Sequence, residues 1–168
     1  MPPSYFLTFT TYGTWLNGSP KGSVDREHNA FATPFLDRNS GRANQERQLL
    51  DQPPYTMSGP EREIVCEAIM TLCLERDWRL LAAHVRSNHV HVVVVADRDP
   101  GRVMSDLKAR ASRELTNAGF DTAQRRRWTR HGSTKYLFSD DQVVAAIRYT
   151  LDEQGERMAW YSAEPRTK

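Results

Sequence analysis

The sequence has no hydrophobic run that approaches the roughly 20 residues needed to cross a membrane, and it has only two cysteines. The first residues lack the basic start and the cleavage site of a secretory signal peptide. Cys66 and Cys73 fall on one expected helix, where seven residues separate them by about 10 Å, too far for a disulfide. We therefore expect free, buried thiols, no membrane partner and a reducing, cytoplasmic location.

Internal repeats and a glycine-rich phosphate-binding loop are also absent, so nothing in the sequence indicates a nucleoside triphosphate. The length fits a single domain over residues 1–168. The net charge is only +2, but residues 101–135 carry nine basic and three acidic side chains. This local charge of +6 leaves −4 for the rest of the chain. Such an excess fits either a solvated surface or a polyanion partner, most simply nucleic acid.

The hydrophobic patterns predict elements in the order β, α, β, β, α, β, α. Strands are expected over residues 5–14, 79–86, 88–96 and 134–138, and helices over 60–77, 102–118 and 139–153. A tight turn at Ser87-Asn88 makes the two middle strands an antiparallel hairpin. Residues 17–59 show no sustained period and are expected to form an irregular insertion. This order predicts an α+β, ferredoxin-like antiparallel sheet with helices packed on one face.

A histidine pair stands at the start of the second hairpin strand, in Asn88-His89-Val90-His91. Side chains alternate along a strand, so His89 and His91 point to one face and their rings can converge on a divalent cation. His-x-His pairs are common by chance, but an unpartnered imidazole within an apolar strand is costly, which favours a ligand role. His84 is expected opposite His91 on the neighbouring strand, as a structural or supporting histidine.

The last expected helix carries Tyr149 away from its apolar stripe. The expected buried side is marked by Val144, Ile147 and Leu151. At about 100° per residue, Tyr149 lies nearly opposite this side, beside two alanines that leave room for a substrate. Glu153 follows by one helical turn and can face the same site, whereas Gln154 is rotated away and is the weaker ligand candidate. An exposed tyrosine without a catalytic role is the alternative interpretation.

Together these residues resemble the REP-associated tyrosine transposases, a group of the single-tyrosine HUH (His-hydrophobic-His) transposases. The resemblance rests on the histidine pair, the valines after it and Tyr149 on a C-terminal helix, and it covers residues 5–12 and about 60–155. It implies a ferredoxin-like fold and tyrosine attack on single-stranded DNA, giving a 5′-phosphotyrosine and a free 3′-hydroxyl. By position, it assigns Tyr149 as the nucleophile and His89, His91 and Glu153 as ligands of Mg or Mn. Members usually carry Gln or Asn in place of Glu153.

The resemblance also implies single-stranded or hairpin DNA as the partner, in DNA transposition or the processing of palindromic repeats. The candidate DNA-binding residues come from the basic stretch: Lys108, Arg110, Arg113, Arg125, Arg126, Arg127, Trp128 and Arg130. Trp128 can stack on a base or pack in the core. Two other functions stay open: a non-catalytic single-stranded nucleic-acid-binding module on the same fold, and a hydrolytic metal phosphoesterase. The sequence is compatible with both a homodimer and a monomer.

Overall fold

The computed structural model describes residues 1–14 and 50–163, where the chain forms five strands and three helices. The strands are β1 (Ser4–Thr10), β2 (Arg79–Val85), β3 (His89–Val95), β4 (Ser133–Leu137) and β5 (Ala159–Ser162). The helices are α2 (Gly59–Glu75), α3 (Pro100–Asn117) and α4 (Asp140–Asp152). Of the expected insertion at 17–59, residues 17–49 lie outside the described residues.

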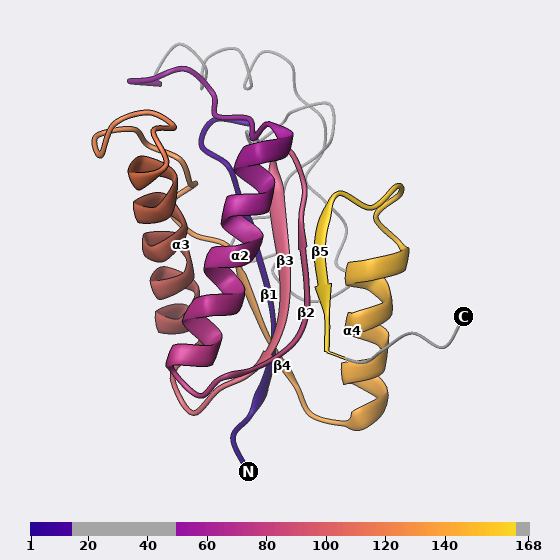
Figure 1. Cartoon of the computed structure of the whole chain (residues 1–168). Coiled ribbons are helices and arrows are strands. Elements are labelled where there is room, and N and C mark those ends of the chain that lie inside the picture. The colour runs from indigo at the N-terminus through magenta and orange to yellow at the C-terminus, as the bar shows by residue number, and fades with distance from the viewer. Residues whose placement is uncertain (15–49, 164–168) are drawn as a thin grey trace.

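The strands form one antiparallel sheet in the order β4-β1-β3-β2-β5 (Figure 1). The elements from β1 to β4 follow the predicted βαββαβ order, and the α+β, ferredoxin-like fold class is confirmed. The tight turn between β2 and β3 is also as predicted, with the Arg86 N–H donating to the His89 carbonyl oxygen over 2.9 Å. The sequence analysis did not predict β5, which pairs with β2.

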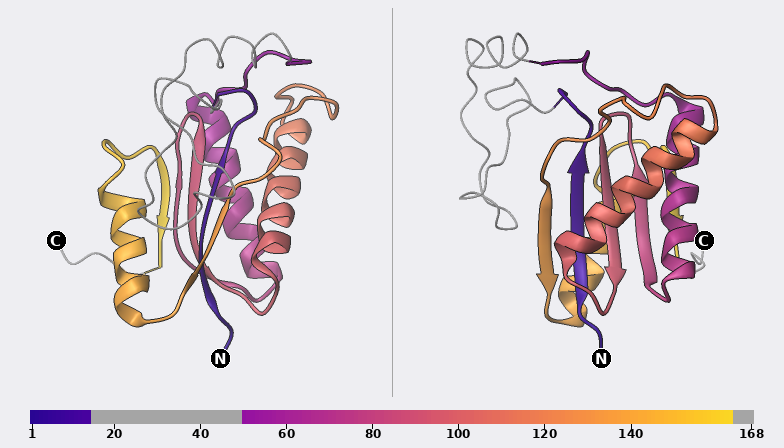
Figure 2. Two further views of the ribbon diagram at one scale, coloured as in Figure 1. Left: turned by 180° about the vertical axis from the view of Figure 1, so that it is seen from behind. Right: turned by 90° about the vertical axis from the view of Figure 1, so that its left-hand side faces the viewer.

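Helices cover both faces of the sheet, α2 and α3 on one side and α4 on the other (Figure 2). The larger core lies under α2 and α3 and includes Tyr5, Leu7 and Phe9 of β1. The smaller core joins α4 to the sheet through Phe6, Val93, Ala146 and Leu151. The prediction that the helices pack on one face is therefore wrong for α4. The α4 face of the sheet also carries apolar side chains, among them Phe6, Leu81 and Val93, and these require a cover of their own.

Local signals in the sequence explain where the helices begin. The Ser58 side chain accepts a hydrogen bond from the Glu61 N–H, and the Glu61 side chain accepts one from the Ser58 N–H, which forms a capping box for α2. Ser139 caps α4, because its side chain accepts a hydrogen bond from the Gln142 N–H over 3.2 Å.

Among the described residues, no helix is both long and apolar enough to span a bilayer.

Both cysteines lie on α2 and face the larger core, free and buried as predicted. Burial raises the pKa of each thiol to about 12, so both are neutral at physiological pH.

Gly132 allows β4 to start close against β1. A Cβ at this position would lie 2.5 Å from the Thr8 carbonyl oxygen and 2.7 Å from the Met104 sulfur. Any larger side chain would push the start of β4 away from β1. This close approach fixes the position of the edge strand beside the residues discussed next.

Candidate active site

The turn between β2 and β3 is anchored from both sides. The Asn88 carbonyl oxygen accepts a hydrogen bond from the Thr11 N–H over 2.9 Å, just beyond the end of β1. The Ser87 carbonyl oxygen accepts one from the Met57 N–H over 2.8 Å. Because His89 follows this turn directly, its backbone is fixed relative to β1 and to the start of α2.

The histidine pair shares the face of the sheet that α4 covers, and its ring centroids lie 4.9 Å apart at an interplanar angle of 74°. The same-face prediction is confirmed by the register, in which Thr8 pairs with His91 and Thr10 with His89. His89 Nδ1 donates to the Asn88 side-chain oxygen over 2.7 Å. His91 Nδ1 bonds the Thr8 hydroxyl over 2.9 Å. Contacts of this kind orient histidine ligands in metal sites.

His91 is buried, with only 5% of its surface exposed. The pKa of His91 is lowered to about 3, mainly by burial and in part by the neighbouring His89, while a hydrogen bond with the Gln154 side chain acts in the opposite direction. The ring is therefore neutral at physiological pH, which is the form that binds a metal ion.

The Tyr149 side chain extends from α4 to the histidine pair. Its half-buried ring meets His91 edge to face at a centroid distance of 5.6 Å and Phe6 at 5.8 Å. Tyr149 thus points toward the sheet and the histidine pair.

The predicted buried stripe of α4 is wrong in part, since Val144 is 53% exposed. The buried residues of this helix are Ala146, Thr150 and Leu151. Two of these three side chains are small, and they let α4 lie close to the sheet. The side of α4 that contacts the sheet is therefore rotated from the side predicted from its large apolar residues. As a result, Tyr149 lies at the edge of the contact with the sheet and not on the opposite side of the helix.

The residues that follow Tyr149 do not all continue the helix, although the sequence analysis expected a helix as far as Glu153. The half-buried Gln154 donates to the Tyr149 carbonyl oxygen over 3.3 Å and hydrogen-bonds His91. Glu153 is exposed and caps the end of α4 with φ −112° and ψ 14°, so regular helical spacing stops at Asp152. The structure brings Gln154 to the histidine pair and leaves Glu153 on the surface. Within residues 1–14 and 50–163, no three His, Cys, Asp or Glu side chains are grouped to hold a metal ion.

His84 fastens both α4 and the following segment to the sheet. It pairs with His91 across β2 and β3, as predicted, and is fully buried. Its Nδ1 donates to the Thr150 carbonyl oxygen over 2.9 Å, and its Nε2 accepts from the Met158 N–H over 3.0 Å. Burial lowers the pKa of His84. With both ring nitrogens occupied, His84 has a structural role.

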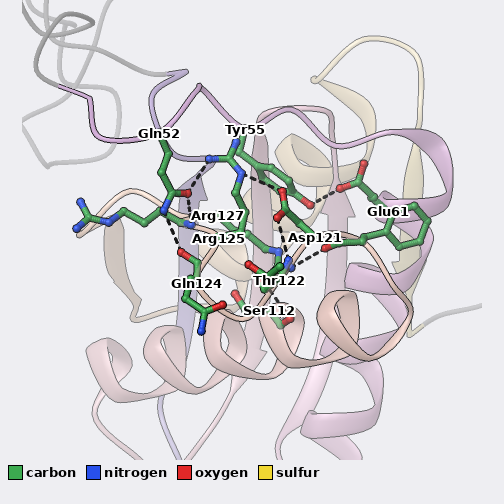
Figure 3. A network of polar contacts seen from close by, with 11 residues as sticks. Gln52, Tyr55, Glu61, Ser112, Asp121, Thr122, Gln124, Arg125 and Arg127 are labelled. Atoms are coloured by element: carbon green, nitrogen blue, oxygen red, sulfur yellow. Dashed lines mark hydrogen bonds and ion pairs between the residues drawn. The ribbon is translucent and has the colours of Figure 1, made fainter.

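Several of the candidate DNA-binding residues instead hold the loop after α3. Arg127 is only 2% exposed, and its guanidinium donates to the carbonyl oxygens of Ser112, Phe120 and Thr122 (Figure 3). Trp128 packs against Phe9, with ring centroids 5.2 Å apart, and its Nε1 donates to the Ser112 hydroxyl over 2.9 Å. Arg127 is therefore buried, and Trp128 is partly buried against the larger core.

Gln52 connects this loop to the segment that precedes α2. Its side-chain oxygen accepts from Arg125 Nη1 over 3.1 Å and from the Arg126 N–H over 2.8 Å, and its amide donates to the Gln124 carbonyl oxygen (Figure 3). The Arg125 guanidinium also lies 5.1 Å from the centroid of the Tyr55 ring. Arg125 is therefore largely engaged in intramolecular contacts.

Lys108 anchors the last part of the loop. Its ammonium donates to the carbonyl oxygens of Thr129 and His131 over 3.0 and 2.9 Å. Burial lowers the pKa of Lys108 to about 8. This lysine ties the start of β4 to α3.

The remaining basic side chains of the candidate set differ in their surroundings. Arg110 is half-buried and forms an ion pair with Glu75. Arg113, Arg126 and Arg130 are exposed, and the first two form surface ion pairs with Glu114 and Asp51. The Thr129 N–H donates to the Thr10 carbonyl oxygen over 3.0 Å, and Thr10 is paired with His89. Arg130 therefore leaves the loop at the end of the sheet where the histidine pair begins.

Comparison with known proteins gives a family match and a similar solved structure. A family model described as IS200-like transposase matches residues 55–142, more than half of the chain. The matched range contains His89 and His91 and ends before Tyr149. The chain is also similar to a solved REP-associated tyrosine transposase bound to a REP hairpin, at 12% identity and a TM-score of 0.48. That similarity covers 89% of this chain and 64% of the solved one. No curated protein matches the chain.

Proposed function

The chain belongs to the family of IS200-like transposases, and on this basis we propose that it is a metal-dependent enzyme that nicks and joins single-stranded DNA through Tyr149. One observation carries the proposal. The Tyr149 ring, which lies outside the range matched by the family model, packs 5.6 Å from His91, on the face that also carries His89. A nucleophile, two imidazoles and an amide side chain thus meet at one place, although they come from separate elements.

In the proposed reaction, the Tyr149 oxygen attacks the phosphorus of a DNA phosphodiester. A bond forms between the tyrosine oxygen and phosphorus, and the bond from phosphorus to the 3′ oxygen breaks. The phenol loses its proton, and the departing 3′ oxygen takes one up as a hydroxyl. The DNA 3′ of the break stays joined to Tyr149 as a 5′-phosphotyrosine. Attack by a 3′-hydroxyl reverses these steps and joins strands without a nucleoside triphosphate.

We propose that His89 and His91 hold Mg or Mn together with a side chain that follows Tyr149. The resemblance favours Glu153 for the third ligand, and the geometry favours Gln154, whose side chain hydrogen-bonds His91. Two imidazoles oriented by Asn88 and Thr8, with an amide oxygen beside them, are a donor set that fits a divalent ion. The metal would act as a Lewis acid on a phosphoryl oxygen.

We propose single-stranded DNA next to a hairpin stem as the substrate. A tyrosine needs an unpaired, flexible strand to reach a phosphodiester in line, and a stem offers a rigid row of phosphates to exposed cations. Arg113, Arg126 and Arg130 are the exposed members of the candidate set that can make such contacts. Arg130 is the closest of these in the fold to the start of β3, because its neighbour Thr129 is bonded to Thr10.

The direct test is covalent capture of DNA. Hairpin DNA with a single-stranded 5′ flank, labelled at its 3′ end, is incubated with the protein and Mn or Mg and analysed on a denaturing gel. The wild type is expected to form a labelled adduct and Tyr149→Phe none, although Tyr149→Phe keeps the ring contacts with His91 and Phe6. Tyr136→Phe is the matched control, because Tyr136 is an exposed tyrosine on β4.

The outcomes separate the three functions. An adduct with Tyr149→Phe would exclude Tyr149 as the nucleophile. DNA binding by the wild type without cleavage would favour a non-catalytic binding module, and metal-dependent cleavage without an adduct would favour a hydrolytic phosphoesterase.

A further inference from the structure

Lys135 lies on the same face of the sheet as the histidine pair. It is in β4, an edge strand of the sheet (Figure 2). Its partner on the neighbouring strand is Phe6 of β1. Directly opposite residues of an antiparallel pair point to the same face, with Cβ atoms about 5 Å apart. The Phe6 ring in turn lies 5.6 Å from His91 and 5.8 Å from Tyr149, by ring centroids. Phe6 is thus the shared neighbour of Lys135, His91 and Tyr149.

The described residues around Lys135 do not neutralise its charge, so the ammonium can bind an anion. The side chain is half-buried, and its ammonium makes no hydrogen bond or ion pair with another described residue. No described strand residue on the α4 face is acidic: this face carries Ser4, Phe6, Thr8 and Thr10 of β1, His89, His91, Val93 and Val95 of β3, and Ser133 and Leu137 of β4. Burial lowers the pKa of Lys135, as expected for a cation without a counter-ion.

We propose that Lys135 contacts the phosphate that Tyr149 attacks, and that it approaches this phosphate from the side opposite the histidine pair. This inference rests on the function proposed above. A phosphodiester carries one negative charge, and more charge develops on its non-bridging oxygens as the tyrosine oxygen approaches. An ammonium is a compact point charge suited to one such oxygen. The attacked phosphate would then lie between Lys135 on β4 and the metal ion that the histidine pair on β3 would hold.

Edge strands also carry lysines for a different reason, because a charge deters pairing with another chain. That role requires only that the charge be present at the edge, and it predicts no effect on the rate of DNA cleavage. The two roles are therefore distinguished by kinetics measured on a protein that is still folded and monodisperse.

The test compares Lys135→Met, Lys135→Arg and the wild type. Met keeps the aliphatic stem, and Arg keeps the charge. Arg79→Met is the control, since Arg79 is an exposed cation at the far end of β2. At saturating DNA, Lys135→Met is expected to slow adduct formation on the order of 100-fold. Lys135→Arg should recover much of the rate, and Arg79→Met should match the wild type. An unchanged rate in Lys135→Met would overturn the inference.

A neutral methylphosphonate at the cleaved position gives a second readout. If Lys135 acts on the phosphate charge, this replacement should slow the wild type more than it slows Lys135→Met. Equal slowing of both proteins would contradict the contact.

Failure of the proposed function is recognised separately, because the wild type would then form no adduct with any DNA. In that case the log–log salt slope of single-stranded DNA binding tests the inference: losing one phosphate contact should reduce the slope by about 0.7 in Lys135→Met. An unchanged slope would overturn the contact itself.

Discussion

His91 and Tyr149 meet edge to face across the boundary between the sheet and α4, with ring centroids 5.6 Å apart and an interplanar angle of 76°. The His91 ring is held by Thr8, and the Tyr149 ring also packs on Phe6. The position of the candidate nucleophile is therefore set by how α4 packs on β1 and β3. Substitutions that preserve this packing can test chemistry, and substitutions that disturb it test the fold.

Binding measurements can test which side chain is the third ligand of the proposed metal ion. We expect Gln154→Ala to weaken Mn²⁺ binding by at least about tenfold, because Gln154 reaches His91, whereas Glu153→Gln should change it little. His89→Ala and His91→Ala should each reduce binding more strongly. Isothermal titration calorimetry measures all four variants. The opposite ranking of Gln154→Ala and Glu153→Gln would return Glu153 to the ligand set.

DNA binding should depend on the exposed arginines of the basic loop. Replacing Arg126 and Arg130 by Ala should reduce the log–log salt slope of single-stranded DNA binding by about 1.4, or roughly 0.7 for each phosphate contact. The thermal stability should change little, because both side chains are exposed. Affinity measured by fluorescence anisotropy at several salt concentrations gives the slope. If the slope of the double variant equals that of the wild type, the loop is only a solvated surface.

Arg127 should behave differently from its neighbour Arg126. Arg127→Met removes the donor to three carbonyl oxygens, so we expect the free energy of unfolding to fall by about 3 kcal/mol. Arg126→Met breaks only an exposed ion pair with Asp51 and should cost less than about 1 kcal/mol. Urea unfolding of the two variants provides the comparison. Similar losses in both would mean that the Arg127 contacts contribute little to stability.

His84 predicts a pH dependence of stability. Burial lowers its pKa in the folded state, so below about pH 6.5 the unfolded chain binds a proton that the folded chain does not. The His84 contribution is therefore present above pH 6.5 and is lost as the pH falls toward the folded-state pKa, by at most about 1.4 kcal/mol per pH unit. The stability advantage of the wild type over His84→Gln should shrink between pH 7.5 and pH 5.5 in urea unfolding. An advantage independent of pH would show that the pKa is not lowered.

The positions of the histidines on the sheet could be predicted from the sequence, because side chains alternate between the two faces of a strand. His89 and His91 share a face in any extended conformation, and the two-residue turn then sets His84 opposite His91. The helix was harder to predict. Its contact face depends on small residues such as Ala146 and Thr150, which a pattern of large apolar side chains underweights.

The third ligand of the proposed metal ion could not be assigned from sequence, because the choice between Glu153 and Gln154 depends on where α4 ends. A continued helix would bring Glu153 beneath Tyr149, but the helix stops at Asp152 and the chain turns Gln154 inward instead. The basic stretch shows a similar limit. Composition gives the charges of Lys108 and Arg127 but not their hydrogen-bond partners. These partners are backbone carbonyl oxygens, such as that of Thr129 for Lys108 and that of Phe120 for Arg127.

The unequal sizes of the two cores have a consequence for motion. Many large side chains hold α2 and α3 to the sheet, whereas a small set around Phe6 and Leu151 holds α4. Local opening requires less free energy where less apolar surface is buried. The amide hydrogens of α4 should therefore exchange with solvent through sub-global openings, while those of α2 exchange only on global unfolding. The helix that carries Tyr149 can thus separate from the sheet at a lower cost than α2 or α3, with the β1-β3 centre left intact.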